Sequence, residues 1–148
     1  MAHDFAQENE ASRGELRALA ASLRDEDLAR DLGNGWTVST VLCHLAFWDR
    51  VVLCRIANWQ RSGFERVHLA QQTVNAINEA ALELSRSVPG REALRMALER
   101  AEEIDALVER LSAGLVDQID ASGSVRTLRR YLHRREHLRR ITEALGSA

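Results

Sequence analysis

The chain has 148 residues, of which 45% are hydrophobic and 28% charged, and its formal net charge is −2. That length suits a single globular domain over residues 1–148, and the small net charge gives no global field that would draw the protein to nucleic acid or to a membrane. We expect a soluble, cytoplasmic protein, because the N-terminus lacks a signal-peptide core and no stretch approaches the roughly 20 apolar residues that cross a bilayer.

The first half of the chain is expected to be helical, since the sequence has one proline and eight glycines. Apolar residues at helical spacing predict a first helix over Asn9–Arg24. A turn is expected at Gly33 to Gly35, and Thr37 is then a suitable N-cap for a second helix that ends near Trp59.

The second half continues the same pattern. A shorter amphipathic segment from Leu69 to Leu84 is followed by a break at Pro89 and a long helix over Arg91–Leu111. A linker rich in glycine and serine then leads to a last helix over Val125–Leu145, with Ser124 as its cap. The sum predicts an all-α fold: a four-helix bundle with one long connection carrying a short extra helix.

Two histidines in the last predicted helix suggest a metal site. His133 and His137 are four residues apart, which puts their rings on one helical face with Cβ atoms about 5–6 Å apart. Such a pair can share one metal ion, with each nitrogen at about 2.0–2.1 Å. A third ligand must come from elsewhere in the chain, and His44 in the second helix is the best candidate.

The two cysteines are not expected to take part. Cys43 and Cys54 are eleven residues apart, about 16 Å along one helix, so they cannot form a disulfide with each other. Cys43 also lies about 100° round the helix from His44. We expect both thiols to be reduced and to project away from the apolar face of the second helix.

The motif Gly35-Trp36-Thr37-Val38, the run His44-Leu45-Ala46-Phe47-Trp48-Asp49 and the pair His133-x-x-x-His137 resemble the DinB/YfiT-like superfamily. That superfamily includes the metal-binding domain of mycothiol-dependent maleylpyruvate isomerases. The resemblance implies a DinB-like four-helix bundle, often a homodimer, that holds a divalent metal through His44, His133 and His137. It also implies a low-molecular-weight thiol, because several members are S-transferases or isomerases that use mycothiol, bacillithiol or glutathione.

Together these observations predict a metal-dependent protein that acts on a small molecule. Three imidazoles favour zinc or nickel and leave a coordination position open. The expected activity is that of a thiol S-transferase or isomerase, or of a hydrolase, on a small electrophilic substrate. All twenty basic residues are arginine, a coding bias that fits mycothiol as the donor. The alternative is a non-catalytic small-molecule binding or self-resistance protein, since no further acid, base or nucleophile is evident.

Two other patterns in the last helix have simpler explanations. The run from His133 to His137, with Glu136, matches the H-x-x-E-H pattern of a protease class, but only eleven residues follow it. Seven arginines and two acids lie in the same helix. We interpret them as a solvated, ion-paired surface, part of which could hold an anionic substrate, and we expect no nucleic-acid partner.

Overall fold

The computed structural model describes residues 4–146. Its elements follow one another along the chain as α1 (Asp4–Ser22), α2 (Asp25–Leu28), β1 (Asp31–Gly33), β2 (Trp36–Thr37), α3 (Val38–Ser62), α4 (Gln71–Ser85), α5 (Gly90–Glu109), α6 (Ala113–Ala121), α7 (Val125–Leu128) and α8 (Arg130–Gly146). None of these helices is long and apolar enough to cross a membrane.

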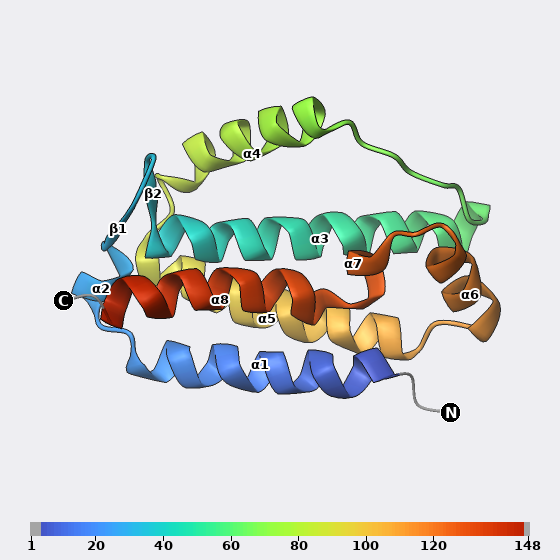
Figure 1. The fold of residues 1–148 in the computed structure, drawn as a ribbon, viewed down its shortest axis with the longest axis horizontal. Helices are drawn as coiled ribbons and strands as arrows, with labels where there is room; N and C mark the ends of the chain where they lie inside the picture. Colours follow the sequence, from blue (N-terminus) through green and yellow to red (C-terminus); the bar gives the residue numbers. More distant parts are fainter. Residues whose placement is uncertain (1–3, 147–148) are drawn as a thin grey trace.

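Four long helices, α1, α3, α5 and α8, form the bundle (Figure 1). α3 packs against α5 and α8, and α1 packs against the same two helices from the opposite side. α4 lies outside the bundle against α3 and is reached by a connection over residues 63–70 that contains no helix or strand. The all-α fold and the long connection with its extra helix are therefore confirmed.

α3 is the helix that carries His44, and its start is fixed by the predicted cap. The Thr37 hydroxyl accepts a hydrogen bond from the Thr40 backbone N–H at 3.2 Å, and the Thr40 hydroxyl accepts one from the Thr37 N–H at 2.8 Å. This reciprocal pair satisfies two amide groups that the first turn leaves free. The helix continues to Ser62, where Gly63 adopts a φ of +89° and ends it.

Some boundaries differ from the prediction. α1 spans Asp4–Ser22 instead of Asn9–Arg24, and the acidic stretch after it forms the short helix α2 and a small antiparallel hairpin of β1 and β2. The expected linker contains α6, because Ser112 caps the Leu115 amide at 3.2 Å and the apolar side of this helix is buried.

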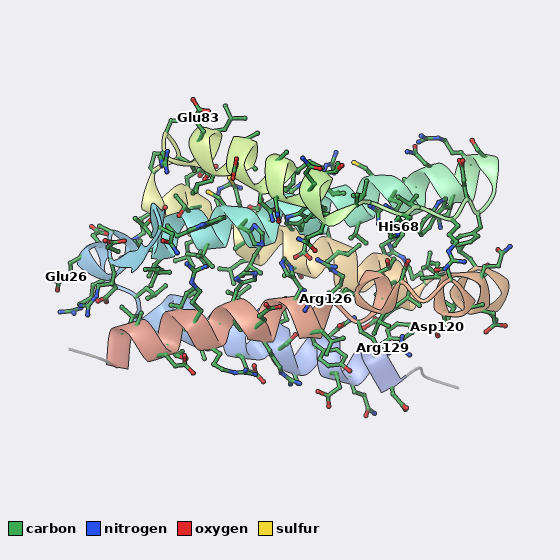
Figure 2. All side chains as sticks on the ribbon, turned by 45° about the horizontal axis from the view of Figure 1, so that its top comes forward. Glu26, His68, Glu83, Asp120, Arg126 and Arg129 are labelled. Carbon is green, nitrogen blue, oxygen red and sulfur yellow. The ribbon has the colours of Figure 1, made fainter. Side chains whose placement is uncertain are left out.

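The last predicted helix is broken into α7 and α8 at Arg129. Asn9, on α1, holds the two parts together: its side-chain Nδ2 donates to the Leu128 carbonyl and its Oδ1 accepts from the Tyr131 N–H, both at 2.9 Å. The partly buried Arg129 at the break pairs with Asp120 of α6 at 2.7 Å (Figure 2). An amide from a distant helix thus sets where α8 begins.

The core contains two apolar clusters, one toward each end of the bundle. On each of the four long helices, buried polar side chains lie where the two clusters meet. We call them the polar layer; its members are Asn9, Ser12, Asp49, Asp105, Arg130, His133 and Arg134. Because the two apolar clusters lie on either side of it, this layer is shielded from water, and it is where the candidate site lies.

Candidate metal centre

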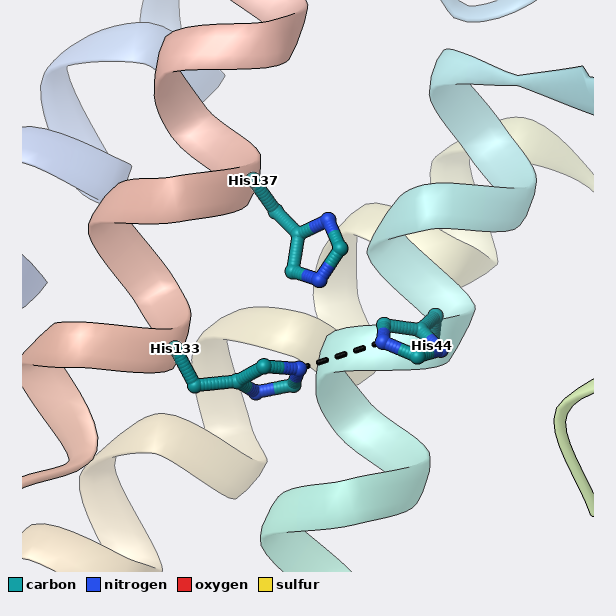
Figure 3. A group of neighbouring side chains, drawn as sticks. All are labelled: His44, His133 and His137. Atoms are coloured by element: carbon teal, nitrogen blue, oxygen red, sulfur yellow. Dashed lines mark hydrogen bonds between the residues drawn. The ribbon is translucent and has the colours of Figure 1, made fainter. Parts of the chain in front are cut away.

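The three predicted ligands converge on one point between α3 and α8. His44 projects from α3, and His133 and His137 project from successive turns of α8, so that the three rings point toward one another (Figure 3). The Nε2 atoms of His44 and His133 are 3.1 Å apart, and one ligand nitrogen from each of the three rings lies within 4.8 Å of the others. The ring centroids are 4.6–5.1 Å apart.

The packing of the bundle produces this arrangement. Spacing of four residues puts His133 and His137 on one face of α8, and that face is turned toward α3. His133 is only 8% exposed, whereas His44 and His137 are half-buried. The Trp36 ring meets His44 edge-on, with centroids 5.4 Å apart, and covers one side of the cluster.

The geometry of the cluster fits a divalent ion. Nitrogens on a tetrahedral zinc ion with bonds of about 2.0–2.1 Å are about 3.3 Å apart, close to the observed 3.1 Å between His44 and His133. Within the described chain, the buried Nδ1 of His137 has no hydrogen-bond partner. An ordinary packed histidine would normally have a hydrogen-bond partner at this buried nitrogen.

All three rings are held neutral, which is the form that binds metal. Burial, followed by the charges of His137, Arg140 and Arg130, lowers the pKa of His44 to about 3. Burial also lowers the pKa of His133 well below its usual value, and it lowers the pKa of His137 although Glu136 acts in the opposite direction. Each ring therefore keeps a lone pair available near neutral pH.

A buried ion pair lies directly behind His133. The Arg130 guanidinium donates to Asp49 Oδ1 at 2.9 and 2.8 Å and to the Arg126 carbonyl at 2.7 Å, and its Nη2 is 3.5 Å from His133 Nδ1. Burial raises the pKa of Asp49, and the charges of Arg130 and Arg134 oppose that rise. The Arg130 guanidinium therefore packs beside the face of the His133 ring that lies away from the cluster.

Two pockets open beside the cluster. The first, of about 660 Å³, lies between α3, α8, α4 and the 63–70 connection, is lined by all three histidines, and contains Trp48, Arg55 and Arg140. The second, of about 580 Å³, lies between α3, α4 and α5, is mostly apolar, and is also lined by Trp36 and His44. The three histidines therefore face a space large enough for a small molecule.

One prediction about the cysteines was wrong. Cys43 does not project away from the core: it is 6% exposed and packs within one apolar cluster, and it also lines the second pocket. The error arose because α3 packs against α5 on the side that carries Cys43, so the buried face of α3 is wider than its apolar stripe indicated. Cys54 is exposed, as expected, and Glu136 is exposed and paired with Arg126 at 2.9 Å.

The expectation of a solvated, ion-paired arginine surface on the last helix was wrong for two arginines, which are ion-paired but buried. Arg130 and Arg134 are 4% and 2% exposed. Arg134 donates to both carboxylate oxygens of Asp105 on α5 at 3.0 Å. The available signal was the position of Asp49 and Asp105 on otherwise apolar helical faces, where a carboxylate needs a cationic partner.

Comparison with known proteins agrees with the resemblance seen in the sequence. The family model of the mycothiol maleylpyruvate isomerase N-terminal domain matches residues 10–138. No curated protein and no solved structure matches the chain. The matched range covers α3 and the first half of α8, and so contains all three histidines. The chain belongs to the family of mycothiol maleylpyruvate isomerase N-terminal domains.

Proposed function

We propose that the protein binds one divalent metal ion, zinc or nickel, through His44, His133 and His137 and uses it to transform a small electrophilic molecule. The observation that carries this proposal is the convergence of three neutral imidazoles beside a pocket of about 660 Å³. Three protein ligands leave one position open for water or a reactant, which is typical of catalytic and not of structural metal sites.

Such an ion, when bound, would lower the pKa of a water or thiol and polarise a carbonyl. The protein supplies the surroundings. Arg130, paired with Asp49, lies beside the His133 ring, and the indole of Trp36 covers His44. Trp48 and Val52 line the same pocket and limit the access of water. Membership of the family supports the thiol route, with mycothiol, bacillithiol or glutathione as donor.

Neither cysteine suits the role of nucleophile. Burial raises the pKa of the Cys43 thiol, so it stays protonated near neutral pH. Cys54 is exposed, lies about 16 Å along α3 from Cys43, and does not line the pocket beside the three histidines. The attacking group is therefore an external thiol or a water molecule.

Metal analysis tests the first part of the proposal. Purified protein supplied with zinc or nickel should hold about one ion per chain, and His44→Ala and His133→Ala should each lose most of it, because two imidazoles hold a divalent ion weakly. His68→Ala is the matched control, since His68 is exposed on the 63–70 connection (Figure 2). Full metal content in both site variants would refute the assignment.

Turnover assays test the second part. Metal-loaded protein would be incubated with each of the three thiols and a panel of electrophiles, beside a Cys43→Ala/Cys54→Ala variant. We expect thiol-dependent product that requires metal and survives loss of both cysteines. Product formed without thiol would assign a hydrolase instead, and saturable binding with no product would assign a binding or self-resistance protein.

A further inference from the structure

Arg55 has an unusual environment in the pocket beside the three histidines. It lies on α3, lines that pocket, and is half-buried. Among residues 4–146, no carboxylate lies within ion-pair distance of its guanidinium. Burial and the nearby charge of Arg130 both lower its pKa. The guanidinium has lost part of its hydration, and its charged neighbour is another cation, so it lacks an anionic partner.

The other arginines at this end of the pocket already have partners. Arg126 pairs with Glu136 at 2.9 Å, and Arg130 pairs with Asp49 at 2.8 Å. Arg55 therefore leaves one positive charge uncompensated here. At the opposite end, Arg140 lies over the Trp36 ring, 5.7 Å from its centroid. The excess of a single cation matches a monoanion such as a carboxylate.

The pocket connects Arg55 to the metal ligands. Arg55 is eleven residues after His44 on α3, about 16 Å along the helix axis. Trp48 and Val52 lie on the same face between them and line the same pocket. Cα–Cβ bonds in a helix tilt toward its N-terminus, so the Arg55 side chain leaves the helix in the direction of the histidines, which shortens this gap. A ligand that touches both must still be elongated.

We propose that Arg55 binds the carboxylate of an elongated ligand whose reactive end lies at His44, His133 and His137. This inference rests on the proposed function, because it takes the three histidines as the reactive end. The middle of the ligand packs along Trp48 and Val52. A carboxylate can accept two parallel N–H bonds from a guanidinium, an arrangement that replaces the water that Arg55 has lost.

A series of thiols tests the proposal on zinc-loaded protein. The probes are 3-mercaptopropionate, 6-mercaptohexanoate and 11-mercaptoundecanoate, each beside the thiol alcohol of the same length, with affinity measured by calorimetry. The longer acids should bind at least about tenfold more tightly than their alcohols. The shortest acid should show no such preference, because its carboxylate cannot reach Arg55. Equal affinities of acid and alcohol at every length would overturn the proposal.

Two variants test whether Arg55 causes the preference for the long acids. Arg55→Gln should abolish the preference for the long acids without changing zinc content. Arg50→Gln is the matched control, because Arg50 is also on α3 but lines the second pocket and not the first. It should keep the preference. A preference retained in Arg55→Gln, or lost equally in both variants, would contradict the role of Arg55.

An experiment on metal-free protein distinguishes failure of this inference from failure of the proposed function. Metal-free protein would be titrated with hexanoate and with hexanol while the arginine Nε–Hε signals are followed by NMR. Hexanoate should shift the Arg55 signal and leave the Arg50 signal in place. If wild-type protein takes up no zinc but Arg55 responds in this way, the proposed function fails and the carboxylate site stands. No response of Arg55 would refute the carboxylate site whatever the metal content.

Discussion

His44 couples the stability of the metal-free protein to pH. Its pKa is about 3 in the folded protein against 6.5 in the unfolded chain, so between these values the unfolded state binds more protons. The free energy of unfolding must therefore fall as pH falls below 6.5. From about pH 7 to about pH 5 the loss from this one residue is roughly 2 kcal/mol.

Urea unfolding of the metal-free protein at several pH values would measure this loss. His44→Gln should reduce the pH dependence, because it removes one titrating group while His133 and His137 still titrate with lowered pKa values, whereas His68→Gln should leave it unchanged. An identical slope in wild type and His44→Gln would show that His44 titrates normally in the folded state.

The two cysteines should differ in reactivity. Cys54 is exposed, whereas Cys43 is 6% exposed and burial raises its pKa. Since the thiolate is the form that reacts, iodoacetamide should modify Cys54 in the native protein at least about tenfold faster than Cys43. Mass spectrometry of peptides over a time course would give the two rates. Equal rates would mean that the packing around Cys43 opens easily.

Between elements, the pair of Arg134 and Asp105 connects α8 to α5 at full burial. Asp105 is 0% exposed and also accepts from Arg13 of α1 at 3.1 Å. Asp105→Asn would leave two arginines without their shared carboxylate, and we expect a loss of about 3–5 kcal/mol in the free energy of unfolding.

Arg135→Gln is the control for that change. Arg135 is on the same helix but its ion pairs with Glu8 and Glu15 are at the surface, so the loss should be below about 1 kcal/mol. Chemical denaturation of both variants would test the difference. Similar losses would indicate that the buried pair contributes no more than the exposed ones.

The elements also show which features the sequence could predict. The Thr37 cap and the spacing of His133 and His137 depend on neighbours within one turn, so they could be predicted without tertiary structure. The burial of Arg134 could not be predicted from its own helix, where an arginine is normally solvated; its signal was Asp105 on the apolar face of α5. The break at Arg129 depends in the same way on Asn9 of α1, which no local pattern identifies.

Across the whole molecule, α4 is a long helix that lies outside the four-helix bundle and is only lightly attached to it. Its buried residues are Leu82 and Ser85, and one side-chain hydrogen bond, from Trp48 to Asn78 at 2.8 Å, joins it to α3. We expect amide hydrogens in α4 to exchange at least about tenfold faster than those in the middle of α3.

Added zinc should increase the difference in amide exchange rate between α4 and α3. It should slow exchange in α3 and α8, which carry the three histidines, and leave α4 unaffected. Hydrogen exchange with mass spectrometry would measure both states. Strong protection of α4 in the metal-free protein would contradict the expected weak attachment.

The Asn9 amide has a consequence for the order in which the protein folds. Its two hydrogen bonds join residues that are 119 and 122 positions apart, so they form only after the entropy of closing a very long loop has been lost. Until then the first turn of α8 has no fixed start, and His133, three residues after Arg130, has no fixed direction. We therefore expect the three histidines to bind a metal ion together only late in folding, after α1 and α8 have packed against each other.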